Sequence, residues 1–382
     1  MKPPTMQMIA DQAGVSLMTV SRALKNNPRL SLATRERIRK IATGLGYRPN
    51  PLVSALMAQI RHARAPKVWP TIAFLTAHPD EVYTRAHTYN ARIHAGAAER
   101  AVMLGYRLER FSLAEPGMTG ARMRGMLLAR GIPGVILPPL PDPIPDIGFD
   151  WSPFACATVG YSYTTPALHR AANDQFNTIR TAVHRLTGLG YERIGLAIRH
   201  EDDHRVENKW GGGFLSFHPY LPARRRLPVF LWHYARNQPR ACAHTRAGEE
   251  GWEDWEGSGE MPSGFSAWFH RHKPDAIISL QPLMVRTWLK SLGARVPEDV
   301  SLVSLNLQHN QSGFSGVDQN NALLGAAAVE LVVEQIHHNE HGVPARAKTV
   351  MIMGDWVEGA TTRRQKPPKR PTVPAPAATP VE

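Results

Sequence analysis

The sequence predicts an α/β protein that carries a small all-helical unit at its N-terminus. Residues 71–77, TIAFLTA, begin a series in which short apolar segments alternate with helical ones, and a second series begins at 180–199. Such alternation builds parallel sheets flanked by helices, and two series indicate two doubly wound subdomains. The first sixty residues show only helical spacing. At 382 residues, the chain is also too long for one compact core.

Positive charge gathers at the two ends of the chain. The formal net charge is +13. Residues 1–64 hold eleven Lys or Arg against Asp11 and Glu36, a net of +9. Residues 363–382 hold five against Glu382, a net of +4, so residues 65–362 are neutral overall. A basic N-terminal unit on a neutral body indicates a polyanion contact confined to one end.

Three short helices can be drawn in the N-terminal unit. Thr5 is a candidate N-cap for the first, and Gly14 suits the left-handed turn that ends it. Ser16 is the candidate cap of the second helix and Ser31 of the third, which ends at Gly46. Two helices joined by a glycine-containing turn form the helix-turn-helix arrangement.

Strand and helix segments follow one another through the rest of the chain. We expect a helix over 87–104, strands over 134–139 and 154–161, and later strands over 275–280 and 299–307. Ligands of such folds bind at the carboxyl ends of the strands. Cys156 and Cys242 are too few for a disulfide scaffold or a zinc site, and we expect buried thiols.

Several short motifs stand at fixed spacings over the first fifty residues. They are Ala13-Gly14-Val15-Ser16, Thr19-Val20-Ser21-Arg22, Thr34-Arg35, Gly46-Tyr47 and Pro49-Asn50. This run resembles the headpiece of the lactose-repressor (LacI/GalR) family of bacterial transcription regulators. The resemblance implies a DNA-binding domain over 1–60, in which the helix after Ser16 enters the major groove of double-stranded DNA.

The resemblance also implies roles for individual side chains. Arg22 can fork onto O6 and N7 of guanine, whereas Leu17 and Met18 can read only thymine methyl groups and shape. Hydroxyl and amide donors suit phosphates, which fix the docking but do not read sequence. The predicted DNA contacts are Thr5, Ser16, Leu17, Met18, Thr19, Ser21, Arg22, Asn26, Ser31, Thr34, Tyr47, Asn50, Val53 and Leu56.

Residues 47–56 match the hinge of the same family. The resemblance implies a short helix over about 49–59 that pairs with its dimer mate in the minor groove. Leu56 stands at the place of a leucine that is levered between the central base pairs. An ordinary linker is the alternative, and it would leave Leu56 and Met57 as an unexplained exposed apolar pair. A basic linker over 61–69 follows.

Most of residues 70–360 resemble the effector-binding core of the family, which is built like the periplasmic sugar-binding proteins. The motifs are EPGM, RGIPGVIL, Asn173-Asp174, LGYERIGL, VPEDVSLVSL and LGAAAVELVVEQI. The resemblance implies one subdomain over 70–165 plus 316–340 and a second over 166–312 plus 345–360. The basic, Pro/Ala-rich tail, 361–382, is expected to be disordered, and it lacks the leucine heptads of tetrameric relatives.

Two departures from the family leave the effector open. Trp210 stands where relatives carry a clamping arginine, and Gln281 begins the pair that replaces their Asn-Asp. An indole favours stacking on a neutral, flat or sugar-ring face over gripping an anion. We expect Trp210 and Phe214 to form an apolar platform, Asp174 and Gln281 to bind hydroxyl groups, and His78 to lie at the facing strand end.

The sequence therefore predicts a cytoplasmic, homodimeric transcription regulator of near-palindromic DNA that responds to a small molecule, with a carbohydrate as the candidate. We expect no enzyme activity, no catalytic residue, no cofactor, no metal and no membrane contact. A metal-dependent hydrolase is one alternative, because HEDDH at 200–204 fits the H-E-x-x-H pattern. It would use His200, Glu201 and His204, but the motif follows a strand directly and lacks an apolar helix. Residues 211–214, GGGF, are expected to form a turn. An architectural DNA-binding protein without an effector is the third reading.

Overall fold

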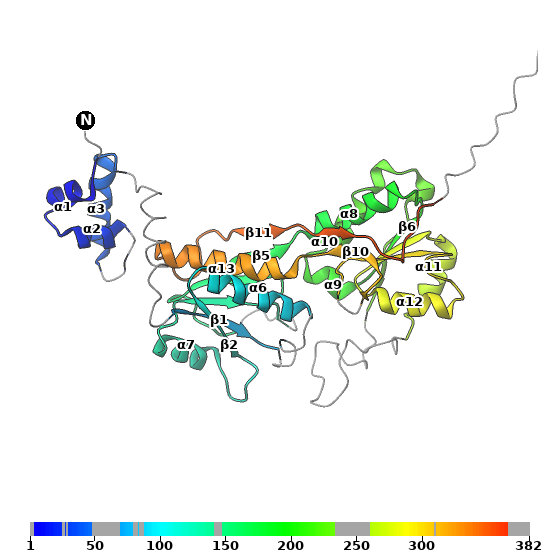
Figure 1. Ribbon diagram of the computed structural model, residues 1–382, viewed down its shortest axis with the longest axis horizontal. Helices are drawn as coiled ribbons and strands as arrows, with labels where there is room; N and C mark the ends of the chain where they lie inside the picture. The colour runs from blue at the N-terminus through cyan, green and yellow to red at the C-terminus, as the bar shows by residue number, and fades with distance from the viewer. Residues whose placement is uncertain are drawn as a thin grey trace, which may run out of the picture.

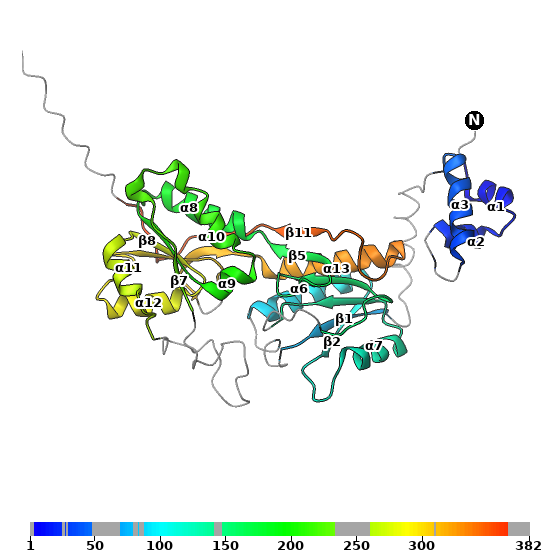
Figure 2. The same cartoon turned by 180° about the vertical axis from the view of Figure 1, so that it is seen from behind.

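The computed structural model describes residues 4–24, 27, 30–47, 69–78, 83, 88–140, 147–233, 260–308 and 311–365. They form a three-helix N-terminal unit and two six-stranded sheets, each with helices on both faces (Figure 1 and, from behind, Figure 2). The predicted fold class is therefore confirmed.

The N-terminal unit holds the three expected helices. They are α1 (Met6–Ala13), α2 (Leu17–Leu24) and α3 (Leu32–Gly44). The hydroxyls of Thr5, Ser16 and Ser31 each accept a hydrogen bond from a backbone N–H three residues on, at 3.2–3.3 Å. Gly14 has a φ of 63°, the left-handed conformation that ends α1. The small core of the unit consists of Ile9, Ala10, Ala13, Val20, Ala23, Ile38 and Ala42.

The first sheet is wholly parallel, in the order β11-β5-β4-β3-β1-β2. Its strands are β1 (Thr71–Thr76), β2 (Arg107–Ser112), β3 (Gly134–Leu137), β4 (Ala155–Val159), β5 (His169–Asn173) and β11 (Thr349–Ile352). Helices α6 (Tyr89–Met103) and α13 (Asn321–His338) cover one face, and α7 (Gly120–Ala129) covers the other. Cys156 is buried on β4, as expected, and burial raises its pKa to about 12; Cys242 lies outside the described residues.

The second sheet has the order β12-β10-β9-β8-β6-β7 and is parallel except for β12. Its strands are β6 (Ile194–Arg199), β7 (Phe230–Trp232), β8 (Ala276–Ser279), β9 (Ser301–Ser304), β10 (Ser315–Asp318) and β12 (Asp355–Val357). One face packs on α8 (Gln175–Gly188) and α10 (Lys209–Leu215), the other on α11 (Phe265–His272) and α12 (Pro282–Ser291). The short α9 (His200–Arg205) follows β6, and two 3₁₀ turns, His218–Tyr220 and Ala223–Arg225, precede β7.

The chain crosses between the two sheets three times, from β5 to α8, from β10 to α13 and from β11 to β12. These crossings differ from the expected subdomain limits. β5 belongs to the first sheet although it follows residue 165, and β11 pairs with β5 in that sheet although 345–360 were assigned to the second. The sequence of β5, HRAAN, did not predict an apolar strand because it carries three polar side chains, although all five residues are buried.

Helices α6 and α13 touch backbone to backbone. A Cβ atom added to Gly325 would lie 1.9 Å from the carbonyl oxygen of Ile93, and one added to Gly96 would lie 2.0 Å from that of Ala322. Side chains larger than a hydrogen at either glycine would push the helices apart. The glycines thus permit α13 to be buried between α6 and the sheet.

We expect Gly325→Ala to destabilise the first subdomain, because the methyl group meets backbone atoms that cannot rotate away. Overpacking of this kind costs about 1–3 kcal/mol, and thermal unfolding followed by circular dichroism would measure it. Gly125→Ala on α7 is the matched control, because an added Cβ there has no neighbour within 4 Å. That change should stabilise its helix by about 0.5–1 kcal/mol. Equal melting temperatures for the two variants would contradict the close crossing.

Candidate functional site

The exposed start of α2 is the first candidate site. Leu17 is 45% exposed and Met18 61%, whereas Val20 and Ala23 on the same helix are buried against the other two helices. Arg22, one turn beyond Met18, is also exposed. Two apolar side chains and one guanidinium group are therefore free to contact a partner along one exposed helix.

Hydroxyl pairs fix the beginnings of α2 and α3. Ser16 Oγ lies 2.9 Å from Thr19 Oγ1, and Ser31 Oγ lies 2.8 Å from Thr34 Oγ1. Ser16 and Ser31 thus cap their helices, and Thr19 and Thr34 lie beside them in the first turns. A hydroxyl oxygen that accepts from an N–H still has its own O–H to donate. Tyr47 is half-buried against the core of the unit. Asn26, Asn50, Val53 and Leu56 lie outside the described residues.

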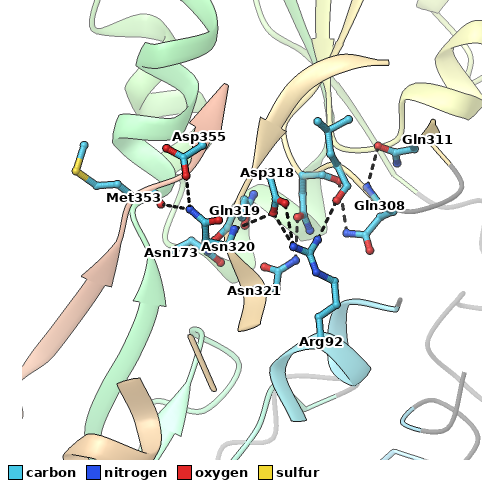
Figure 3. A network of polar contacts seen from close by, with 12 residues as sticks. Arg92, Asn173, Gln308, Gln311, Asp318, Gln319, Asn320, Asn321, Met353 and Asp355 are labelled. Atoms are coloured by element: carbon cyan, nitrogen blue, oxygen red, sulfur yellow. Dashed lines mark hydrogen bonds and ion pairs between the residues drawn. The ribbon is translucent and has the colours of Figure 1, made fainter. Parts of the chain in front are cut away.

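The second candidate site is the boundary between the two subdomains, where side chains of both meet. Arg92 on α6 donates from Nη2 to both carboxylate oxygens of Asp318 at the end of β10, each at 2.9 Å. Its Nη1 also donates to the carbonyl oxygen of Leu307, at 3.5 Å. Figure 3 shows this guanidinium reaching from the first subdomain to the second. A bidentate pair of this geometry fixes direction as well as distance.

Amide side chains hold the three crossing segments together (Figure 3). Asn173 Nδ2 donates to the carbonyl oxygen of Gln319 at 2.7 Å, tying the first crossing to the second. Asn320 Nδ2 donates to Met353 O at 3.1 Å and to Asp355 Oδ2 at 2.8 Å, tying the second to the third. Hydrogen bonds therefore tie the three crossings to one another.

Four further side chains meet at the boundary, and none was predicted. Arg205, the last residue of α9, donates from Nη1 to Leu140 O of the first subdomain at 2.9 Å. The Lys209 ammonium lies 4.1 Å from the centre of the Tyr161 ring. Burial raises the pKa of Tyr89 to about 12, against the opposing effect of the positive charge of Arg205. The boundary therefore joins two tyrosine rings with two cations.

The expected aromatic platform is wrong. Trp210 and Phe214 are 2% and 4% exposed and belong to the apolar core between α8, α10 and the second sheet. Residues 211–214 are helical in α10, whereas we expected a turn. The side chain of Asp203 accepts from the N–H groups of Trp210 and Gly211, both at 3.1 Å, and so starts the helix. A helix that begins there turns the indole inward.

The other expected effector contacts lie at the ends of strands. His78 follows β1, is 7% exposed, and has its Nε2 3.1 Å from Pro139 O. Asp174 caps α8 by accepting from the N–H of Asn177 at 2.9 Å. Gln281 follows β8, and its Nε2 donates to Asp202 Oδ2 at 2.6 Å. These three remain predictions, and Asp174 and Gln281 already have partners within the chain.

Several buried amide oxygens near the boundary have no hydrogen-bond partner within the described residues. They are Gln281 Oε1, Gln308 Oε1 and Asn321 Oδ1, and each belongs to a side chain whose nitrogen is engaged. Asn321 begins α13, and its nitrogen donates across the boundary to Asn306. A buried acceptor without a partner is unfavourable by roughly 1–3 kcal/mol, so these positions favour a ligand that supplies hydroxyl donors.

The HEDDH segment directly follows β6, as expected, and forms a short polar helix. α9 spans His200–Arg205, and the parallel rings of His200 and His204 lie 5.9 Å apart one turn from each other. The carboxylate of Glu201 does not pair with either of these histidines; it lies 3.0 Å from Nδ1 of His233, at the end of β7. The sequence pattern alone missed His233, because the strand that carries it stands in a stretch without a recognisable motif.

Comparison with known proteins follows the same two-part division. A family model described as "Bacterial regulatory proteins, lacI family" matches residues 5–50, and one described as "Periplasmic binding protein-like domain" matches residues 183–362. The N-terminal unit is therefore a DNA-binding domain of the lacI family, and a periplasmic-binding-protein-like core follows it. The chain is accordingly a DNA-binding transcription regulator with a helix-turn-helix headpiece and an effector-binding core.

Sequence similarity to known transcription regulators covers most of the chain. The transcriptional regulator CelR of Thermobifida fusca is 25% identical over 354 residues, 87% of this chain and 92% of its own. The lactose operon repressor of Escherichia coli (strain K12) is 24% identical over 352 residues, 87% and 85% of the two chains. These relatives are transcription regulators.

Solved structures of the lacI family share the fold. A CelR–cellobiose complex superposes with a TM-score of 0.50 at 18% identity, over 94% of this chain and all of that one. A regulator from Rhizobium etli gives 0.54 at 16% identity, over 77% of this chain and 99% of its own. Within the described residues, no helix is long and apolar enough to cross a membrane.

Proposed function

We propose that this regulator binds a near-palindromic operator as a homodimer and that a carbohydrate at the subdomain boundary changes its affinity for that operator. The exposed start of α2 supports the DNA-binding mode. The amide oxygens of Gln281, Gln308 and Asn321, which have no hydrogen-bond partner among the described residues, support a carbohydrate as the effector. A polyhydroxylated ligand offers hydrogen-bond donors to such acceptors.

In the proposed mode, α2 lies in the major groove with Leu17 and Met18 on thymine methyl groups and Arg22 on guanine. The hydroxyls at the starts of α2 and α3, with Thr5, Ser21, Asn26, Tyr47 and Asn50, would contact phosphates. Leu56, after Val53 in the hinge, would wedge open the central step of the operator. A solved structure with the same fold, the lac repressor dimer bound to operator, supports the proposed dimer.

Selection from a random DNA pool tests this part of the proposal. We expect one enriched near-palindromic site whose half-sites lie about one helical turn apart. A protein with no preference over bulk DNA would instead act as an architectural DNA-binding protein.

The effector site is proposed to include Arg205, Tyr89 and Gln281. Arg205 supplies a cation although Trp210 stands at the place of the family's clamping arginine, since Arg205 reaches across the boundary from the segment after β6. The Tyr89 hydroxyl is protonated at neutral pH, as a phenol with an ordinary pKa also is, so that it can donate as well as accept. The solved CelR relative is described as a complex with cellobiose, which supports a carbohydrate here.

A screen of sugars and their oligomers by thermal shift, followed by titration of operator binding, tests the effector class. A sugar that binds should change operator affinity by about 5- to 150-fold, the usual range for coupled sites. Arg205→Ala should abolish that response and keep operator binding without ligand.

Arg224→Ala is the matched control, because it removes an exposed arginine of the same subdomain and should leave the response intact. A sugar response that survives both Arg205→Ala and Gln281→Ala would contradict this site.

We further propose that the chain is not an enzyme and that it acts in the cytoplasm, as a regulator of DNA must. Hydrolysis by an H-E-x-x-H motif needs its glutamate as a general base beside a metal held by both histidines. The pairing of Glu201 with His233 argues against that role. Purified protein should release no product from peptide or ester substrates with added zinc.

A further inference from the structure

We propose that His200, Glu201 and His233 bind a divalent first-row transition metal ion, with Zn²⁺ as the best fit. The site is independent of the operator and of the proposed carbohydrate. It differs from the hydrolase motif, because His233 replaces His204 and the glutamate serves as a ligand.

The pairing of two strands brings these residues together. β6 and β7 run parallel, with Arg199 of one opposite Trp232 of the other. The residue that follows each strand is a histidine, and neighbouring strands lie about 4.8 Å apart. His200 and His233 therefore stand side by side at the carboxyl edge of the sheet, with ring centres 4.7 Å apart.

The side-chain geometry suits a metal ion. One ligand atom from each of His200, Glu201 and His233 can be chosen so that all three lie within 4.8 Å of one another. The tetrahedral bond length of about 2.0–2.1 Å for zinc brings ligand atoms closer still, to roughly 3.3 Å. The side chains of His233 and Glu201 are 65% and 48% exposed, so they have room to close that gap.

The neighbouring acids have other partners, which leaves Glu201 to complete the set. Asp202 pairs with Arg199 and accepts from Gln281, and Asp203 caps α10. Two imidazoles and one carboxylate form a recognised ligand set for zinc, and three protein ligands leave a coordination position open. Imidazole nitrogen favours zinc, copper, iron and nickel over magnesium or calcium.

The test is titration of ZnCl₂ into the untagged, chelator-treated full-length protein by calorimetry, without DNA or sugar. We expect one ion per chain at the tightest site. His233→Ala and Glu201→Gln should each lower the affinity of that site by more than about 100-fold. Mutation of a residue that only hydrogen-bonds to a metal ligand already lowers metal affinity by about 10–100-fold. Co²⁺ in place of Zn²⁺ should show visible absorption bands that both variants lose.

His270→Ala is the matched control, because it removes an exposed histidine of the same subdomain that lies outside the cluster. It should bind Zn²⁺ as the unmodified protein does. All three changes are at exposed positions, so melting temperatures should stay close to that of the unmodified protein. The proposal would be overturned if no ion bound tightly, or if the His233→Ala and Glu201→Gln variants bound Zn²⁺ with the affinity of the unmodified protein. Neither result would affect the proposed regulation.

Discussion

Replacing Trp210 with alanine should lower the free energy of unfolding by about 3–5 kcal/mol, the usual cost of emptying an aromatic site in a core. The indole is 2% exposed and packs with Ile179, Phe214 and Ile198 in one cluster. Its loss removes contacts between α10 and α8 and leaves a cavity that the surrounding residues fill only in part. Denaturant unfolding monitored by circular dichroism would measure the change.

A matched aromatic control lies nearby. Tyr220 is 87% exposed, so Tyr220→Ala should change stability by no more than about 0.5 kcal/mol. The two variants together separate a core role for Trp210 from a role in ligand contact. A Trp210→Ala protein of unchanged stability that loses only its sugar response would restore the platform that the sequence suggested.

Replacing Arg22 with alanine should weaken operator binding by about 1–3 kcal/mol and relax the preference at one guanine in each half-site. The guanidinium is exposed on α2 beside Met18, where it can reach a base edge. Because phosphate contacts dominate binding to random DNA, that binding should fall much less. Fluorescence anisotropy with operator and random duplexes would give both affinities.

Arg39→Ala is the control for charge, since it removes an exposed arginine of α3 in the same unit. It should weaken operator and random DNA by similar factors. Replacing Leu17 and Met18 with serine should instead relax the preference at A·T pairs. If the selected sequence of the Arg22→Ala protein matches that of the unmodified protein, α2 does not read the operator.

Local signals predicted the elements well because they depend on few neighbours. Thr5, Ser16 and Ser31 cap their helices as expected, since a hydroxyl three residues before a free N–H needs no tertiary contact. The pairing of strands that lie far apart in the sequence was harder to predict. β5 is held by β4 and β11, almost two hundred residues apart in sequence, and HRAAN alone carries no apolar alternation.

The candidate site was the least predictable part. An alignment by motif placed Trp210 where a clamping arginine belongs, but α10 begins at Lys209 and turns the indole into the core. Arg205 escaped notice because only the packing of α9 against the first subdomain gives it a partner there. His233 could have been found only from the register of β6 and β7.

The three crossings have a consequence for synthesis on the ribosome. The first sheet needs β11 and the helix α13, which carries a row of buried residues, yet both come after the second sheet's β10. The three-helix unit can fold as soon as it emerges, whereas neither sheet can be completed until residues 349–357 have left the exit tunnel. A chain that terminates prematurely before Asn321 would expose the apolar face that α13 covers. Nascent or truncated chains should therefore present that face to chaperones and proteases, and only the complete chain withdraws it.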